Sequence, residues 1–471
     1  MIFLIIIFSF FIRFLSLNQS LWWDEAINIV YARSTSFWWF VTKYPIGDFH
    51  PPGWFAILWV WGHIFGFSEI SARLPSVIFG VATVYVIYLI GKSLFSKKIG
   101  ILAALFLSLA PLHVYYSQEA RMYSMAVFAV CLSMFFLIEL TKGRKFAFWG
   151  YIFSVFLILY SDYVAYFILP AEVIYILLYG KKYFKRYFLA LIAGMATLVP
   201  WFFVLPGQLA KGQYMVGLVT SWRQVVGGAN IKEVALLLVK TIIGRISFNK
   251  TSFYVVFVLI LSLPYIVILS KLFKKRTRKN NLLLLFLLIP PILAFGFSFV
   301  IPIFSYFRLI FILPIFYLLL AANVVEFKPL WTRILVGLVL FAEIISSSIY
   351  FLNPAFQREN WRGAINSIEK NATENSLALF EYDEIPSTFT YYTNWRLEPK
   401  PGLKKIPAKS SDDLNDLDEL KSKNEIYLFE YLADVTDPER LLEKKLQLLG
   451  FYKTQIYNFN GVGFISLYKR D

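Results

Sequence analysis

Acidic side chains are scarce over most of this chain, so each position that they occupy is informative. Residues 1–351 contain 11 Asp and Glu against 30 Lys and Arg. Asp24 and Glu25 follow two tryptophans, Asp48 precedes a His-Pro-Pro run, and Glu119 stands two residues before Arg121. Carboxylates act as general bases or bind hard cations, and arginine binds phosphate. These polar strings are therefore the first candidates for chemistry.

The composition of the whole chain excludes a soluble enzyme. Of its 471 residues, 58% are hydrophobic and 16% are charged, and the mean hydropathy is +0.61. Soluble domains average about 45–50% apolar and about 25% charged residues. The single cysteine, Cys131, cannot form an intrachain disulfide.

Eleven apolar stretches are long enough to cross a bilayer, whose core needs about 20 mostly apolar residues per helix. They are residues 1–17, 75–94, 99–116, 120–140, 146–161, 163–180, 187–206, 252–270, 281–300, 303–322 and 331–350. The first lacks the basic start and cleavage site of a signal peptide, so we expect it to remain as an anchor. We therefore expect a mainly helical, polytopic membrane protein.

Basic clusters separate these stretches at alternate connections. They are Lys97-Lys98, Lys142–Lys145, Lys181–Arg186 and Lys271–Lys279. Such clusters mark cytoplasmic loops. We expect a multi-pass protein of the cell membrane with a cytoplasmic N-terminus, and the odd number of spans then puts residues 352–471 outside. Because the basic excess is divided among these loops, we exclude nucleic acid as a partner.

Two segments on the predicted outer side are too long to be simple turns. Residues 18–74 interleave Trp, Tyr and Phe with charges, which is typical of helices at the membrane interface. Residues 207–251 are the second segment, which is either a mobile lid or a solvated connection. We assign both to a transmembrane domain over residues 1–351, with the main polar motifs in the loop 18–74.

Residues 352–471 have a soluble composition, with 16 Lys and Arg and 19 Asp and Glu. The pattern predicts short strands at 377–380, 426–429 and 462–467 and helices at 360–371 and 437–449. We expect a small α/β domain outside the membrane.

Three strings occur in an ordered series along the first third of the chain. They are LWWDEA at 21–26, DFHPP at 48–52 followed by RLPSVIFG at 73–80, and HVYYSQEARMY at 113–123. Their order and spacing resemble the C-type (GT-C) glycosyltransferases of the protein O-mannosyltransferase superfamily. The likeness is to the prokaryotic branch, which includes the lipid A aminoarabinose transferases. SYFR at 305–308 and ENWR at 359–362 also resemble that branch.

This resemblance implies an enzyme that takes a sugar from a polyprenyl-phosphate donor. It would pass the sugar, with inversion, to a hydroxyl of a glycolipid, cell-envelope polymer or protein on the outer face. Inverting transfer needs a general base. The family's candidate base in the first outer loop corresponds to Asp24, with Glu25 beside it, and Asp48 and Glu119 match two further acidic positions of the family.

The same resemblance implies cations that hold the departing phosphate. Arg73 matches the family's arginine before its second span, and Arg121 and Arg308 lie at predicted outer ends of spans. His50 could add a donor. Each arginine also has an ordinary alternative, in which its side chain reaches the lipid headgroups. Arg13, near the outer end of the first span, has no explanation from the sequence.

The metal requirement stays open at this stage. Three histidines and one cysteine argue against a dedicated zinc site. A divalent cation could instead be shared by Asp24, Glu25, Asp48 and Glu119, because hard cations favour carboxylate oxygens.

Three other classes of protein compete with this interpretation. A flippase or transporter usually keeps its ionisable residues near the bilayer midplane, whereas most acids here lie towards one predicted face. An oligosaccharide ligase would take a pyrophosphate-linked glycan. Only the identity of the donor separates such a ligase from a transferase that uses a polyprenyl-phosphate sugar. A non-catalytic scaffold gives no reason for the cluster of outer acids.

Overall fold

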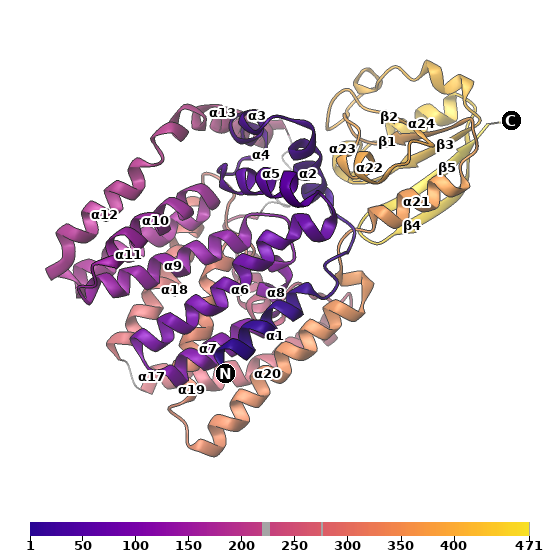
Figure 1. The fold of residues 1–471 in the computed structure, drawn as a ribbon. Helices are drawn as coiled ribbons and strands as arrows, with labels where there is room; N and C mark the ends of the chain where they lie inside the picture. Colours follow the sequence, from indigo (N-terminus) through magenta and orange to yellow (C-terminus); the bar gives the residue numbers. More distant parts are fainter. Residues whose placement is uncertain (219–226, 275–276, 471) are drawn as a thin grey trace. The chain divides into compact units, whose positions relative to one another are not determined.

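The computed structural model describes residues 1–218, 227–274 and 277–470 (Figure 1). Residues 219–226, in the predicted second outer segment, and 275–276, in the basic cluster Lys271–Lys279, lie outside the described part. The chain divides into two compact units. The helical unit comprises Met1–Leu17, Phe37–Leu209 and Val226–Phe356, and the α/β unit comprises Asn18–Ser36, Ala210–Val225 and Gln357–Asp471.

This division differs from the predicted boundary at residues 351 and 352. It lies after Phe356, and it assigns residues 18–36 to the α/β unit although they precede most of the spans. The physical reason is aromatic packing. The Trp23 ring stacks on Tyr431 at a centroid distance of 5.1 Å and meets Tyr382 edge-on at 5.0 Å.

Helices make up the helical unit. Its longer helices are α1 (Ile2–Phe14), α5 (Gly53–Phe65), α6 (Glu69–Leu94), α7 (Lys97–Leu109), α9 (Tyr123–Thr141), α10 (Phe146–Ser161), α11 (Ile168–Tyr179), α12 (Phe184–Ala196), α15 (Ile231–Ile243), α16 (Thr251–Leu269), α18 (Arg278–Phe297), α19 (Leu313–Val324) and α20 (Pro329–Leu352). Its shorter ones are α3 (Phe37–Thr42), α4 (Pro45–Asp48), α8 (Pro111–Ser117) and α17 (Lys271–Lys274). Helix α13 (Leu205–Leu218) begins in this unit.

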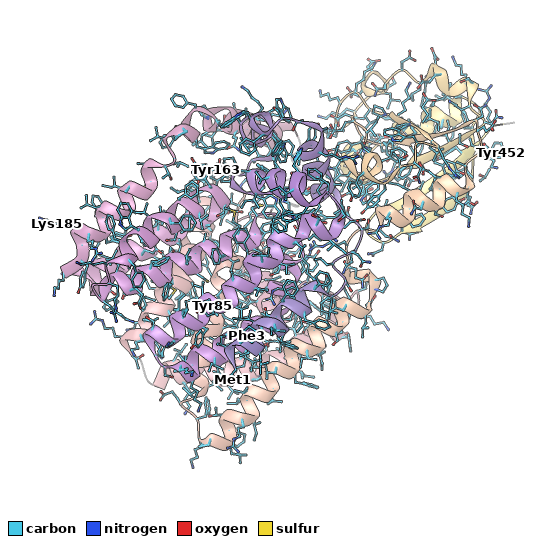
Figure 2. The ribbon with its side chains drawn as sticks, viewed as in Figure 1. Met1, Phe3, Tyr85, Tyr163, Lys185 and Tyr452 are labelled. Carbon is cyan, nitrogen blue, oxygen red and sulfur yellow. The ribbon has the colours of Figure 1, made fainter. Side chains whose placement is uncertain are left out.

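Each of the eleven predicted spans is helical over most of its length. Among the described residues, five helices are long and apolar enough to cross a membrane, namely α6, α9, α16, α18 and α20, and two bent helix pairs raise the number to seven. Large apolar side chains such as Phe3 and Tyr85 point outwards (Figure 2), with 69% and 44% of their surface exposed. Outward-facing apolar groups suit a lipid environment. The protein is a polytopic helical membrane protein, as predicted.

Small residues and helix breaks shape the centre of this unit. Helices α6 and α7 pack so closely that a Cβ on Gly91 would lie 2.6 Å from the Cα of Gly100, a use of small residues that is common between membrane helices. Helix α9 packs along α6, and α10 packs along α9 (Figure 1). The chain bends by 64° between α7 and α8, where Pro111 starts the second helix.

The first outer segment consists of short helices, as predicted. Helix α4 ends at Asp48, residues 49–52 are not helical, and α5 starts at Gly53. Pro51 and Pro52 fall in this break, and proline cannot donate a helical hydrogen bond. The break turns the chain back at His50.

The α/β unit contains a five-stranded mixed sheet in the order β2-β1-β3-β5-β4. Its strands are β1 (Ser376–Phe380), β2 (Glu398–Pro401), β3 (Glu425–Phe429), β4 (Tyr452–Phe459) and β5 (Gly463–Lys469). Its helices are α2 (Trp23–Ser34), α21 (Trp361–Asn371), α22 (Ser387–Tyr392), α23 (Ala433–Thr436) and α24 (Leu441–Leu448). Strands β1, β3 and β5 match the predicted ones, whereas β2 and β4 were not predicted.

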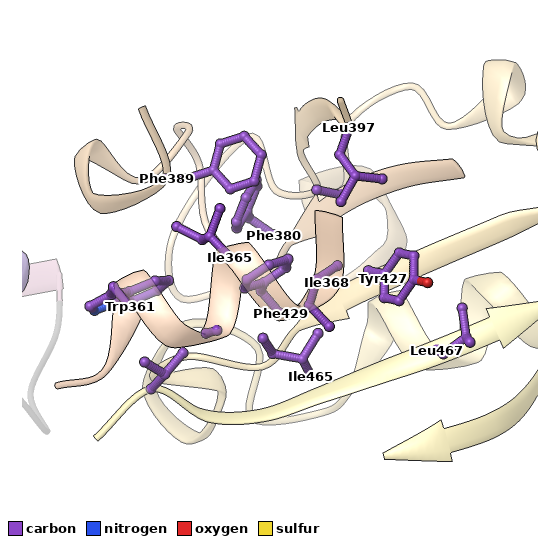
Figure 3. Packing of buried hydrophobic residues seen from close by; sticks show 13 residues of the cluster. Trp361, Ile365, Ile368, Phe380, Phe389, Leu397, Tyr427, Phe429, Ile465 and Leu467 are labelled. Atoms are coloured by element: carbon purple, nitrogen blue, oxygen red, sulfur yellow. The ribbon is translucent and has the colours of Figure 1, made fainter. Parts of the chain in front are cut away.

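Both faces of the sheet are covered. Ala378, Phe380 and Phe429 point to one face, where they pack with Trp361 and Ile365 of α21 (Figure 3). Alternate residues of the same strands, Leu377, Leu379 and Leu428 among them, pack on the other face with Leu442 and Leu446 of α24. Burial on both faces explains why β1 and β3 are continuous apolar runs.

Candidate functional site

An ion pair joins the first outer segment to the turn between α8 and α9. Arg121 Nη1 donates to Asp48 Oδ2 at 3.1 Å, and His50 Nδ1 is hydrogen-bonded to the other oxygen of the same carboxylate. Phe49, in the left-handed region with φ of 67°, turns the chain so that His50 faces Asp48. Burial would raise the pKa of Asp48, but Arg121 and His50 outweigh it and hold the pKa well below its usual range.

The loop that carries Asp48 and His50 is held by residues that the sequence analysis did not identify. Gln208 Nε2, at the start of α13, donates to the backbone oxygens of Pro45 at 2.7 Å and His50 at 3.1 Å. Tyr163 donates to the Gln208 oxygen and accepts a hydrogen bond from Trp201 Nε1 at 2.7 Å. No sequence motif marks Gln208, because its role depends on a contact across more than 150 residues.

Glu119 lies in the tight turn that precedes α9. Only 1% of Glu119 and 3% of Arg121 are exposed. The Arg121 N–H donates to the Glu119 carbonyl at 2.7 Å, and Ser76 of α6 donates to the Arg121 carbonyl at 3.2 Å. These hydrogen bonds fix the backbone of the turn. The SQEAR string predicted that the turn carries site residues, but it did not predict how the backbone is held.

Arg308 lies near this turn, in the segment that leads into α19. Its Nη1 donates to the Pro302 carbonyl at 3.0 Å, and its charge interacts with Arg121, Tyr123 and Asp162. The helical unit therefore brings Asp48, His50, Glu119, Arg121 and Arg308 into one region.

Arg245, just after α15, also belongs to this region. Its Nη1 donates to the Tyr115 hydroxyl at 2.8 Å, its guanidinium carbon lies 4.8 Å from the ring centroid, and its charge interacts with Glu119 and Tyr306. The side chain remains exposed and lines a pocket with Tyr115 and Ser346. In the sequence, only the position of Arg245 in the second outer segment indicated that it could belong to the site.

Lys240 fixes the turn that presents Arg245. Its Nζ donates to the Ile246 carbonyl at 2.5 Å, to Ser247 Oγ at 2.8 Å and to the Tyr254 hydroxyl at 3.2 Å. Burial and the charge of Arg245 lower the pKa of Lys240 to about 8. Gly244 makes the turn possible, because it has φ of +69° and a Cβ there would lie 2.9 Å from Pro111.

Arg73 is placed differently from the other predicted phosphate ligands. It is 1% exposed, and its Nη1 donates to the Leu17 carbonyl at 2.8 Å. This contact ties α6 to the end of the first span, and it gives Arg73 a structural role that the sequence analysis did not consider.

Asp24 and Glu25 lie in the α/β unit, in the first turn of α2. Glu25 is fully buried and caps the helix, because its Oε2 accepts a hydrogen bond from the Trp22 N–H at 3.4 Å. Asp24 is partly exposed, and its charge interacts with Glu359, Tyr382 and Tyr431. The two neighbouring acids thus occupy different environments.

Glu359 anchors the start of α2 in the same unit. Its carboxylate accepts hydrogen bonds from the Trp23 N–H at 3.2 Å, Trp361 Nε1 at 2.7 Å and the Tyr431 hydroxyl at 3.0 Å. Burial, together with the charge of Asp24, raises the pKa of Glu359 to about 7, although its hydrogen bonds act in the opposite direction. The ENWR string at 359–362 therefore binds the segment that carries Asp24.

No group of three or more His, Cys, Asp or Glu side chains within the described residues is arranged to hold a metal ion. Asp48, one of the four proposed ligands, is already engaged with Arg121 and His50, and Glu25 caps α2.

Comparison with solved structures identifies the fold. ArnT from Cupriavidus metallidurans bound to undecaprenyl phosphate superposes with a TM-score of 0.64 at 14% identity, covering 99% of this chain and 97% of that one. The chain has the fold of a GT-C glycosyltransferase. ArnT in the apo state superposes on this chain with a TM-score of 0.61 at 14% identity, with the same coverage.

A second kind of enzyme shares the fold more distantly. The archaeal oligosaccharyltransferase AglB from Archaeoglobus fulgidus was solved in complex with an inhibitory peptide and a dolichol-phosphate. It superposes on this chain with a TM-score of 0.50 at 11% identity. That comparison covers 99% of this chain and 74% of AglB.

Residues 49–206 of this chain match the dolichyl-phosphate-mannose-protein mannosyltransferase family. The match contains His50, Arg73, Glu119 and Arg121, and it does not reach Asp24. No curated protein matches the chain.

Proposed function

We propose that this protein is an integral-membrane glycosyltransferase. It moves a sugar from a polyprenyl-phosphate donor to an acceptor hydroxyl, with inversion at the sugar carbon. The observation that carries the proposal is the group of arginines around Glu119 in the helical unit, because a GT-C fold that handles a lipid phosphate needs cations at the end of the lipid. The family match and the likeness to ArnT, which was solved with undecaprenyl phosphate, support it.

Arg245 and Arg308 are the proposed phosphate ligands. Arg245 is exposed and lies among tyrosines, and Arg308 spends one donor on a backbone carbonyl. Arg121 is less suited because Asp48 already balances its charge, and Arg73 is engaged with Leu17. Positive charge at the phosphate favours departure of the polyprenyl phosphate as the bond to the sugar breaks.

Asp24 is the proposed general base. It takes the proton of the acceptor hydroxyl while the acceptor oxygen bonds to the sugar carbon and the carbon–oxygen bond to the donor phosphate breaks. Asp48 fits this role poorly, since its lowered pKa and its ion pair make it a weak proton acceptor. Glu119 is the competing candidate, and the variants Asp24→Asn and Glu119→Gln separate the two.

The orientation in the membrane follows from the basic clusters. We infer that the N-terminus is cytoplasmic and that the α/β unit is extracytoplasmic, where the sugar of a lipid-linked donor and an envelope acceptor would meet. The proposed acceptor is a hydroxyl of a glycolipid, a cell-envelope polymer or a protein.

Lipid binding tests the proposal directly. Undecaprenyl phosphate binding to the purified protein is measured by native mass spectrometry for wild type, Arg245→Ala, Arg308→Ala and Arg333→Ala. The last removes the same charge from an exposed position on α20. We expect about tenfold weaker binding for each of the first two variants and no change for the third, since one lost charge-assisted hydrogen bond is worth about 1.5 kcal/mol or more.

Equal binding by all four proteins would contradict the proposed phosphate site. Transfer from a panel of polyprenyl-phosphate sugars then identifies the donor. Activity only with pyrophosphate-linked glycans would instead indicate an oligosaccharide ligase.

A further inference from the structure

Arg13 is a fully buried arginine near the end of α1. Its Nη1 donates to the Ser9 hydroxyl at 2.6 Å and to the Ser108 carbonyl at 3.0 Å, and its Nη2 donates to the Leu107 carbonyl at 3.3 Å. It also contacts His113 Nδ1 at 2.6 Å and Ser117 Oγ at 3.2 Å. None of these described partners is an acid, so charge pairing does not explain why an arginine is buried here.

Leu107 and Ser108, two of its carbonyl partners, lie where α7 ends and the chain bends into α8. In a continuous helix the Leu107 carbonyl would accept from residue 111, but Pro111 has no N–H. The guanidinium supplies donors to Leu107 and Ser108 at this break, and a buried carbonyl without a donor is costly in a membrane. Arg13 therefore stabilises the 64° bend between the two helices.

The same side chain fixes the far end of α8. Its Nε donates to Ser117, and Gly80 of α6 leaves the space for this contact, since a Cβ there would lie 2.2 Å from Ser117 Oγ and 3.1 Å from Arg13 Nε. The backbone carbonyls of Arg13 and Leu15 accept from Gln118 Nε2 at 3.0 and 2.5 Å. Gln118 is the residue directly before Glu119.

We propose that Arg13 is a positioning residue for the turn Gln118–Arg121. It sets the location of Glu119 and of the Arg121 guanidinium that pairs with Asp48, without contact with any substrate. A neutral apolar residue would leave the carbonyls of Leu107 and Ser108 at the bend, and the Ser117 hydroxyl before the turn, without the donors that Arg13 supplies. The catalytic part of this inference rests on the proposed function, and within it on a contribution of Glu119 to the transfer step.

A double-mutant cycle tests the catalytic part. Arg13→Lys keeps the charge and loses the planar fork of donors, and Arg13→Gln is the second variant if the lysine protein does not fold. Tyr151→Phe is the matched control, because Tyr151 is as deeply buried as Arg13 and lies in another part of the helical unit. The substitution removes a hydroxyl that donates to Glu172 at 2.5 Å.

We expect Arg13→Lys to lower kcat by about 10²-fold, since small displacements of catalytic groups have effects of this size. In a Glu119→Gln background the same change should cost about threefold or less, because residues that act as a unit are not additive. Tyr151→Phe should have the same small effect in both backgrounds. Equal effects of Arg13→Lys in both backgrounds would overturn the inference.

Amide hydrogen exchange separates this inference from the proposed function. Residues 118–121 should exchange about tenfold faster in Arg13→Lys than in Tyr151→Phe, since loss of the guanidinium contacts to Ser117 and to the bend releases the end of α8 that leads into the turn. This measurement needs no substrate, so it decides the positioning role even if wild type transfers no sugar. Unchanged exchange in the turn would contradict it.

Discussion

At the scale of single residues, the helical unit gives chemically similar acids different roles. Asp48 is fixed between Arg121 and His50, with its pKa held low, whereas Glu119 lies in a turn whose backbone is held by neighbouring residues. Asp48 thus balances the charge of a buried arginine. From the sequence alone Asp48 resembles the catalytic acids, because its ion pair with Arg121 depends on the fold.

Loss of the Asp48 carboxylate should destabilise the protein. Asp48→Ala removes the ion pair with Arg121, and breaking a buried pair from one side typically costs about 3–5 kcal/mol. We expect a clear fall in the thermal unfolding temperature in detergent. The double variant Asp48→Ala/Arg121→Met should recover part of the loss. A double variant less stable than Asp48→Ala would show that the pair is not the reason.

The general-base assignment is tested by Asp24→Asn, which keeps the shape and removes the proton acceptor. We expect transfer to fall about 10²–10⁴-fold, the usual contribution of general-base catalysis, with undecaprenyl phosphate binding unchanged. Asp383→Asn, an exposed acid of the same unit, is the control. If Glu119→Gln abolishes turnover while Asp24→Asn stays active, the base is Glu119.

At the scale of elements, the start of α2 depends on a carboxylate from the other end of the chain. Glu359 accepts three hydrogen bonds there, and Trp23 packs against Tyr431 and Tyr382. The helix that carries Asp24 is therefore positioned by residues more than 300 positions later in the sequence.

The raised pKa of Glu359 makes the α/β unit sensitive to pH. Its pKa is about 7 in the folded protein against an ordinary 4.5, so the folded state binds more protons between these values. Stability should therefore be greatest below about pH 4.5 for this group and fall as pH rises through about 7. Tryptophan fluorescence during thermal unfolding at pH 5 to 8 measures this.

The variant Glu359→Gln should flatten that pH dependence, because it removes the titrating group. Glu439→Gln, on the surface of the same unit, should leave it unchanged. Parallel pH profiles for wild type and Glu359→Gln would rule out Glu359 as the titrating group.

At the scale of the whole molecule, the basic clusters predict which side of the membrane each connection occupies. In intact cells an impermeant maleimide should label Ser410→Cys, in the α/β unit, and should not label Lys182→Cys, in a predicted cytoplasmic cluster. Both positions are exposed, and the native Cys131 is 1% exposed, so background labelling is low. The reverse pattern would place the proposed site on the cytoplasmic side.

Features that depend on local sequence were predicted correctly. The apolar spans are helical and the chain at Pro51 and Pro52 is not, as expected. The length of an apolar stretch favours a helix, and a proline interrupts one, without help from residues far away in the chain. Strands β2 and β4 were not predicted, because their local sequence lacks the pattern of a buried strand. They are edge strands, β2 contains two prolines, and β4 is largely exposed, so neither has the apolar pattern of a buried strand.

Composition and residue order were enough to predict the class of protein, the helical spans and the strings that hold Asp24, Asp48 and Glu119. Tertiary structure decided what each residue does. It brought Arg245 near Glu119, turned Glu25 into a helix cap, joined Asp48 to Arg121 and gave Arg13 its partners. These roles arise from contacts between segments far apart in the chain or from the exact backbone geometry of a turn, and neither leaves a periodic signal in the sequence.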